Sequence, residues 1–149
     1  MVRMTPVVAS PPVLALFSGL DLEPAVFERG VAEARQRQVP LVLLNVRHQQ
    51  QAERLAEALT SNSFMGRGAV EQLKRQIKDQ RSELVRKTLE TMAAEARSLG
   101  LDVVTRWEKG DLSAIVAAQI AELKPALVVT DCKYPGALPK DVQVICVAA

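Results

Sequence analysis

The sequence is poor in the residue types that build metal centres. It has two cysteines and one histidine among 149 residues, and Cys132 and Cys146 do not form a CxxC pair. One histidine cannot complete a zinc cluster with these cysteines at any familiar spacing. The cysteine usage indicates a reducing compartment, and we expect a cytoplasmic protein.

Long apolar runs and a large net charge are also absent. No apolar run approaches the roughly 20 residues that span a bilayer, and Pro11 and Pro12 delimit a short run that we interpret as a strand rather than a signal peptide. The formal net charge is +2, so electrostatics does not demand a polyanionic partner. We therefore expect neither a membrane span nor nucleic-acid binding.

The first part of the chain alternates between continuous apolar runs, typical of buried strands, and a helical apolar pattern. Residues 13–17 (VLALF) and 41–46 (LVLLNV) are continuous runs, typical of strands buried on both faces of a parallel sheet. Pro24 suits the first turn of a helix between them, and Pro40 stops that helix. The helix would bury one face, made of Val26, Phe27, Gly30, Val31 and Ala34.

The second part repeats this pattern. Residues 101–107 (LDVVTRW) alternate as a half-exposed edge strand does, and Asp111 can cap the helix that follows. Residues 126–130 (ALVVT) and 142–147 (VQVICV) supply two more strands. The stripe of the capped helix consists of Leu112, Ile115, Val116, Ile120 and Leu123.

The middle of the chain predicts a helix that is too long for the sheet. An apolar pattern runs from Ala69 to Leu99, which corresponds to roughly 45 Å of helix at 1.5 Å per residue. A strand of five or six residues covers only about 17–20 Å. We therefore expect residues 49–80 to form a helical excursion from a single domain that spans residues 1–149.

Two segments resemble the universal stress protein domain. They are "VLALFSGLDLEPAVFERGVAEARQRQVPLVLLNV" and "LGLDVVTRWEKGDLSAIVAAQIAELKPALVVTD", with a GD helix cap and an ALVVT strand. The resemblance covers residues 13–47 and about 84–149. It implies an α/β fold, a Rossmann-like open five-stranded parallel sheet of order 3-2-1-4-5 with helices on both faces.

In members that bind nucleotides, the resemblance implies that ATP lies among an Asp after the first strand, a Val near the end of the second, and a G-x2-G-x9-G-S/T loop after the fourth. Here Ser18 occupies the Asp position, although Asp21 follows, and Val46 is present. A retained adenine-nucleotide site, for ATP or AMP, would use the cleft residues Ser18, Gly19, Asp21, Val46, Thr130 and Asp131.

The phosphate loop of that pattern is missing. After Asp131 the chain reads CKYPGALPKD, in which Gly136 is the sole glycine. Glycines let several backbone N–H groups approach a phosphate, whereas Pro135 and Pro139 remove donors and stiffen the segment. Lys133 and Lys140 could supply point charges instead. We expect no ATP bound in the family manner, and no other cofactor or metal.

The connection after the fourth strand is also too short for the usual last helix. The ten residues 132–141 can cross to a parallel neighbour only in extended form. We expect one face of the last two strands to lack cover, including Leu127 and Val129. In the family, dimers commonly join through the final strand, so we predict a homodimer through the uncharged edge Val142–Ala148.

Other residues favour plain interpretations. We interpret His48 as solvated, Trp107 as a packing residue, and Cys132 as a small buried residue without a resolving cysteine. The basic residues Lys74, Arg75, Lys78 and Arg81 alternate with acidic ones, which favours a solvated face over a nucleic-acid ridge.

No catalytic constellation emerges, so we do not expect an enzyme. The leading hypothesis is a dimeric regulatory or interaction module of the universal stress type, with a protein partner and without ATP bound in the family manner. The alternatives are an adenine-nucleotide binder with a rebuilt phosphate contact and a small-anion or nucleic-acid binder that uses the basic helix.

Overall fold

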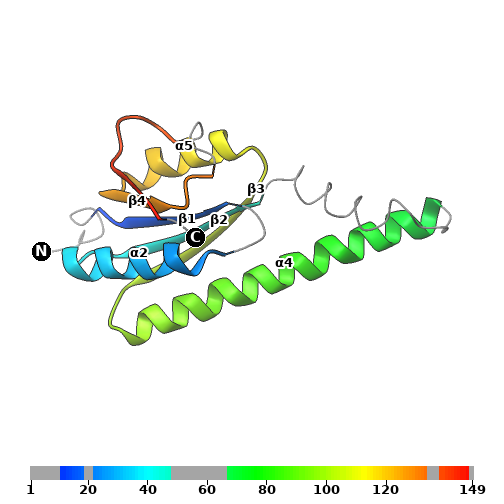
Figure 1. Cartoon of the computed structure of the whole chain (residues 1–149), viewed down its shortest axis with the longest axis horizontal. Coiled ribbons are helices and arrows are strands. Elements are labelled where there is room, and N and C mark those ends of the chain that lie inside the picture. The colour runs from blue at the N-terminus through cyan, green and yellow to red at the C-terminus, as the bar shows by residue number, and fades with distance from the viewer. Residues whose placement is uncertain (1–10, 19–21, 48–66, 134–137, 148–149) are drawn as a thin grey trace, which may run out of the picture.

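The computed structural model describes residues 11–18, 22–47, 67–133 and 138–147. Within these ranges five parallel strands form one sheet of order β3-β2-β1-β4-β5 (Figure 1). This order confirms the predicted fold class. The strands are β1 (Val13–Ser18), β2 (Leu41–Arg47), β3 (Val103–Lys109), β4 (Leu127–Thr130) and β5 (Val144–Cys146).

The first helix, α2 (Pro24–Arg37), packs closely on the centre of the sheet. Glu23 caps it by accepting a hydrogen bond from the N–H of Ala25 at 3.3 Å, and Pro24 begins it. A Cβ on Gly30 would lie 3.3 Å from both Ala15 Cβ and Leu41 Cδ1. The absence of a side chain at Gly30 therefore lets the helix approach β1 and β2.

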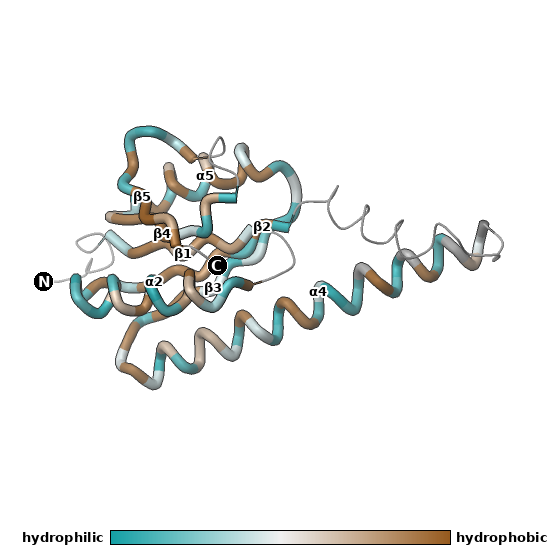
Figure 2. Tube along the Cα trace, in the orientation of Figure 1, coloured by the Kyte–Doolittle hydropathy of each residue, from teal (hydrophilic) through white to brown (hydrophobic). Residues whose placement is uncertain are grey.

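The long helix α4 (Arg67–Ser98) has 32 residues and extends beyond the sheet, as predicted (Figure 1). Its last four turns bury Val85, Leu89, Ala93 and Ala96, a spacing of three or four residues that places them on one face. Polar and apolar residues alternate along the rest of α4 (Figure 2). Of the expected excursion over residues 49–80, only 67–80 lie within the described residues, as the first part of α4.

The third helix, α5 (Leu112–Leu123), covers the opposite face of the sheet. Asp111 caps it, as predicted, by accepting the N–H of Ala114 at 3.0 Å. Leu112 and Val116 pack with Leu14, Leu44 and other residues of that face, whereas α2 and α4 share the other core cluster. Helices therefore cover both faces, and the central strands β1, β2 and β4 are buried throughout.

The connection from β4 to β5 contains no helix in its described residues, 131–133 and 138–143. The expectation that Leu127 and Val129 lack cover is wrong, because both are completely buried. Both belong to the core cluster that α2 and α4 share, and Ile145 and Val147 also pack against that cluster. Leu138 and Val142 from the connection pack against the α5 cluster on the opposite face. The final strand β5 is also shorter than predicted, with three residues instead of six.

Among the described residues, no helix is both long enough and apolar enough to cross a membrane.

Candidate functional site

Polar side chains gather where the central strands end. Among the described residues, the buried polar side chains include Ser18 at the end of β1, Asn45 and Arg47 at the end of β2, and Thr130 at the end of β4. The strands are parallel, so these ends lie at one edge of the sheet. Open α/β sheets bind ligands at this edge, which makes it the candidate site.

Asn45 ties the ends of the two central strands together. Its Nδ2 donates a hydrogen bond to the carbonyl oxygen of Phe17 at 3.1 Å, and the two residues are register partners. The Asn45 side chain is completely buried. An amide at this position holds the end of β1 against β2, immediately before the predicted site residues Ser18 and Val46.

Arg47 joins this edge to the long helix. Its guanidinium donates a hydrogen bond to Ser82 Oγ on α4, and its carbonyl accepts the N–H of Gly110 at 3.1 Å. Burial lowers the pKa of Arg47, and the negative charge of Asp79 on α4 partly opposes that shift. Arginine nevertheless keeps its charge at neutral pH, so a buried cation fixes α4 against the carboxyl end of β2.

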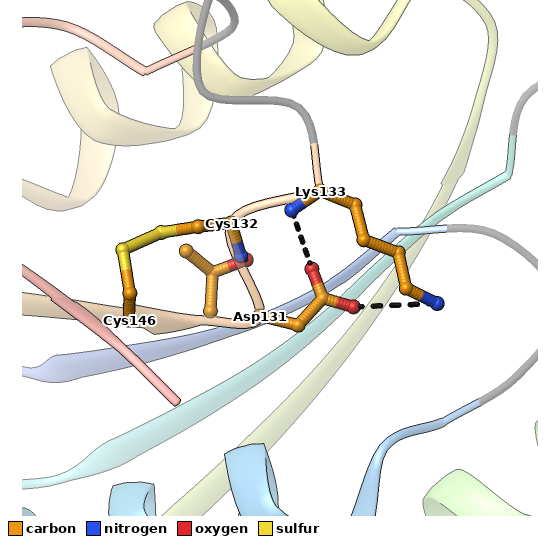
Figure 3. The surroundings of a disulfide bond; sticks show 5 residues. Asp131, Cys132, Lys133 and Cys146 are labelled. Carbon is orange, nitrogen blue, oxygen red and sulfur yellow. Dashed lines mark hydrogen bonds and ion pairs between the residues drawn. A yellow bond between two sulfur atoms is a disulfide. The ribbon is translucent and has the colours of Figure 1, made fainter. Parts of the chain in front are cut away.

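The end of β4 forms a closed turn instead of an open cradle (Figure 3). Asp131 Oδ1 accepts the backbone N–H of Lys133 at 3.1 Å, and Oδ2 lies 3.7 Å from Lys133 Nζ. Cys132 has a left-handed backbone (φ 59°), and its N–H donates to Thr130 Oγ1 at 3.5 Å. The carboxylate thus accepts the backbone N–H of Lys133 and pairs with its ammonium, on the residue that was expected to offer a charge to a phosphate.

The structure brings four of the predicted site residues to this edge. Ser18 and Val46 are register partners, Thr130 ends the neighbouring strand β4, and Asp131 follows it. Val46 is completely buried in the cluster under α5, so its side chain contacts core residues. Gly19 and Asp21 lie outside the described residues. The assignment of these residues to a nucleotide site stays a prediction.

The interpretation of Cys132 as a residue without a resolving cysteine is wrong. Cys132 and Cys146 form a disulfide, with Cα atoms 5.5 Å apart (Figure 3). The pairing arises because β4 and β5 are parallel neighbours in which Thr130 is the register partner of Cys146. Cys132 is half-buried and Cys146 is exposed, so neither is the small buried residue that the sequence indicated.

Two further residues missed by the sequence interpretation are Asn45 and Arg47. Asn45 lies inside a continuous apolar run, and this was the signal available, because an amide within such a run requires a hydrogen-bond partner. The contact of Arg47 with Ser82 joins positions 35 residues apart, which sequence patterns do not reveal.

The other residues that the sequence analysis considered, outside the carboxyl edge of the sheet, show packing or surface positions rather than a binding site. Trp107 packs under Arg86, whose Cζ lies 5.0 Å from the centre of the ring, as a packing residue would. A hollow beside it has a volume of about 140 Å³ and is lined by residues of α4 and β3, which is small beside the roughly 300–1,000 Å³ of ligand pockets. Arg75 and Arg81 are exposed on α4. His48 and the side chains of Lys74 and Lys78 lie outside the described residues.

In the described part of the chain, no three His, Cys, Asp or Glu side chains are placed together so that they could hold a metal ion.

The strand order and the two helical layers define an open, doubly wound α/β protein with its candidate site at the carboxyl edge. More specifically, the fold is that of the universal stress proteins, as the resemblance predicted. By sequence, the chain matches no protein-family model and no curated protein.

The similarity to solved universal stress proteins extends over nearly the whole chain. A family member from Burkholderia pseudomallei is 14% identical with a TM-score of 0.62, over 93% of this chain and 96% of that one. The protein from Archaeoglobus fulgidus in complex with dAMP is 14% identical with a TM-score of 0.58, over 91% and 95%. An Arabidopsis thaliana member with AMP bound is 12% identical with a TM-score of 0.53, over 92% and 90%.

Proposed function

We propose that the chain is a single universal-stress-type domain that acts as a regulatory or interaction module, not as an enzyme. In this proposal it forms a homodimer through the β5 edge and holds no triphosphate in the manner of ATP-binding members. The disulfide overturns the inference of a reducing compartment from the cysteines. The cytoplasm stays the proposed location because the fold resembles the universal stress proteins, and a further protein partner is part of the proposal.

The turn at the end of β4 carries this proposal. A phosphate loop offers free N–H groups and positive charge, whereas here the Asp131 carboxylate accepts the N–H of Lys133 and pairs with its ammonium. An incoming phosphate would meet the negative charge of Asp131 and a backbone N–H that already has an acceptor. The disulfide to β5 further fixes the position of Cys132. These contacts favour a closed edge over a triphosphate site.

The position of β5 at the edge of the described sheet supports the homodimer. β5 pairs on one side with β4 and is the last strand in the sheet order. Val144 and Ile145 are only half-buried, and the strand carries no charge or proline. Unprotected edge strands of this kind pair readily with another chain, and a second copy would extend the sheet symmetrically.

Light scattering on the purified chain tests the dimer. We expect twice the chain mass for the unmutated protein and a monomer for Ile145→Asp, with Val104→Asp as the matched control. Val104 is 48% exposed on β3, the opposite edge of the sheet, so its replacement should leave the dimer intact. A thermal melt of each variant shows whether it folds. A monomeric unmutated chain contradicts the proposal, as does equal dissociation by both variants.

A second candidate function keeps adenine-nucleotide binding at the same edge. It is favoured by the buried polar ends of β1, β2 and β4. The Archaeoglobus and Arabidopsis proteins hold dAMP and AMP, which carry one phosphate and need fewer donors than a triphosphate. In this function Ser18, Gly19, Asp21, Val46, Thr130 and Asp131 line the cleft, and the phosphate contact is rebuilt.

A thermal-shift titration with AMP separates the two functions, because a ligand that binds only the folded state raises the melting temperature. Under the second function AMP stabilises the unmutated chain, and Ser18→Ala weakens that effect. Thr88→Ala is the matched control, because Thr88 is on α4 and its hydroxyl donates to the carbonyl of Leu84. No shift with AMP removes the second candidate.

A further inference from the structure

The two cysteines join the last two strands at the carboxyl edge. Cys132 lies two residues beyond the end of β4, and Cys146 is the last residue of β5. Their Cα atoms are 5.5 Å apart, within the range that a disulfide requires. The bond closes a ring between positions 14 apart in sequence and connects the predicted ligand edge directly to the edge strand.

This disulfide is accessible to thiols from solution. Cys146 is exposed and Cys132 is half-buried, and the neighbouring Lys133 is also exposed. Exchange begins with the attack of a thiolate on one sulfur and therefore depends on access. Exposed disulfides are generally the labile or regulatory ones, whereas purely structural disulfides resist reduction.

β5 is attached through a short pairing and a few packing contacts. The strand has three residues, and within the described residues it pairs with β4 alone; Ile145 and Val147 pack against one core cluster and Val144 against the other. Beyond the ladder, the N–H of Val147 donates to the carbonyl of Thr130 at 2.9 Å, and the side chains of Val144, Ile145 and Val147 are half-buried. Cys132 also keeps a left-handed backbone, which residues other than glycine adopt at a cost. Because the strand is this short, loss of the covalent link weakens the attachment of β5.

We propose that Cys132–Cys146 is a thiol–disulfide exchange site that accepts a dithiol reductant, and that its redox state sets how firmly β5 is held to β4. This inference stands on the disulfide and on β5 alone, and it does not require the proposed homodimer.

The exchange balances as a two-electron step. A thiolate of the dithiol attacks Sγ of the exposed Cys146, forms a mixed disulfide and breaks the Cys132–Cys146 bond. The Cys132 thiolate leaves and takes a proton from water. The second thiol of the reductant then attacks the reductant's own sulfur in the mixed disulfide and releases the Cys146 thiolate, which is also protonated. The protein gains two electrons and two protons, and the dithiol becomes a disulfide.

Thiol titration of the native chain tests the exchange. The purified protein is equilibrated with mixtures of reduced and oxidised dithiothreitol, quenched with acid, alkylated and weighed by mass spectrometry. We expect a reversible transition between no alkylated cysteine and two, without denaturant. Brief exposure of the oxidised protein to reduced glutathione should place the mixed disulfide on Cys146 rather than Cys132.

Hydrogen exchange tests the consequence for β5. On reduction, we expect protection of the Val147 amide to fall by up to about a hundredfold, the value of closing a ring of this length. Amides of β2, at the centre of the sheet, serve as the internal control and should not change. The double variant Cys132→Ser, Cys146→Ser should show the fast exchange of the reduced chain under both conditions.

Three results would overturn the inference. The first is reduction that occurs only in denaturant. The second is a native chain whose two thiols do not oxidise with oxidised dithiothreitol or glutathione. The third is equal protection of Val147 in the oxidised chain, the reduced chain and the double serine variant. None of these readouts involves the mass of the assembly, so failure of the homodimer proposal is observed separately.

Discussion

The carboxylate of Asp131 accepts the backbone N–H of Lys133 at 3.1 Å and lies 3.7 Å from the ammonium of the same residue. One acidic side chain thus uses both groups through which Lys133 could hold an anion. The side chain of Asp131 is 9% exposed and that of Lys133 is 56% exposed, so the acid is fixed and the base is at the surface. This pairing makes the end of β4 a poor place for a phosphate.

Removal of the negative charge of Asp131 should strengthen anion binding at the end of β4. Asp131→Asn frees the Lys133 ammonium and abolishes the repulsion, and a unit charge at 4 Å is worth about 1 kcal/mol even in bulk water. We expect ATP to bind the variant roughly fivefold more tightly than the unmutated chain, whose binding is too weak to saturate, with an affinity that falls as salt rises. Calorimetric titration measures the gain as greater heat for the variant at equal ATP concentration.

Asp141→Asn is the control for this prediction. Asp141 is exposed in the connection to β5, and the substitution removes the same charge as Asp131→Asn does. Equal affinity for ATP in the Asp131 variant and the unmutated chain would show that the carboxylate does not limit anion binding.

The attachment of α4 to the carboxyl end of β2 should depend on Ser82. Ser82→Ala removes the hydrogen bond from the Arg47 guanidinium, and a hydrogen bond to a charged group contributes about 1.5–3 kcal/mol. We expect the free energy of unfolding in urea to fall by that amount. Trp107 is the single tryptophan and lies on β3 under Arg86 of α4, so its fluorescence reports the transition.

Ser98→Ala is the matched control on the same helix. The Ser98 hydroxyl is exposed and donates to the carbonyl of Glu95, so its loss should change the stability by less than about 0.5 kcal/mol. If the two serine variants have the same stability, the contact with Arg47 does not fix α4.

The close approach of α2 to the sheet should make Gly30 intolerant of a side chain. An added Cβ would lie 3.3 Å from Ala15 Cβ, an atom fixed to the backbone of a buried central strand that has little freedom to shift. Overpacking costs about 1–3 kcal/mol, which exceeds the helix-propensity gain of about 1 kcal/mol for Gly→Ala. We therefore expect Gly30→Ala to lower the melting temperature.

The comparison variant is Gly68→Ala in the first turn of α4, where an added Cβ meets nothing within 4 Å. This change should be neutral or stabilising. A Gly30→Ala chain that is as stable as Gly68→Ala would mean that α2 can move away from β1 without cost.

The sheet could be predicted because its signals are local. The continuous runs at Val13–Ser18 and Leu41–Arg47 are buried at every position, as strands between two helical layers must be. Asp111 and Pro24 marked the helix starts correctly because capping and the fixed φ of proline act within one turn.

The cover of the last strands and the disulfide could not be predicted in the same way. Leu138 and Val142 cover the α5 side through a path with no periodic pattern. The pairing of Cys132 with Cys146 depends on the register between β4 and β5. That register was recoverable in principle, because two parallel neighbouring strands ending at Thr130 and Cys146 bring both cysteines to the same level.

The sequence predicted where the candidate site lies but not the contacts that its residues make. The parallel strand order places the site at the carboxyl edge of the sheet, and Ser18, Thr130 and Asp131 lie there. The roles of Arg47 and Asp131 depend on partners supplied by α4 and by the turn after β4. Such long-range and turn-specific hydrogen bonds leave no periodic trace in a sequence.

The most direct test of the account is the identity of any nucleotide that the protein carries. Freshly purified, unmutated chain is denatured, and the released small molecules are identified by mass spectrometry, with a titration of the native chain by ATP and magnesium in parallel. We predict no stoichiometric adenosine triphosphate in the released fraction and no saturable heat in the titration. One equivalent of ATP per chain, or a saturable ATP isotherm that Asp131→Asn leaves unchanged, would contradict the proposal that this edge holds no triphosphate.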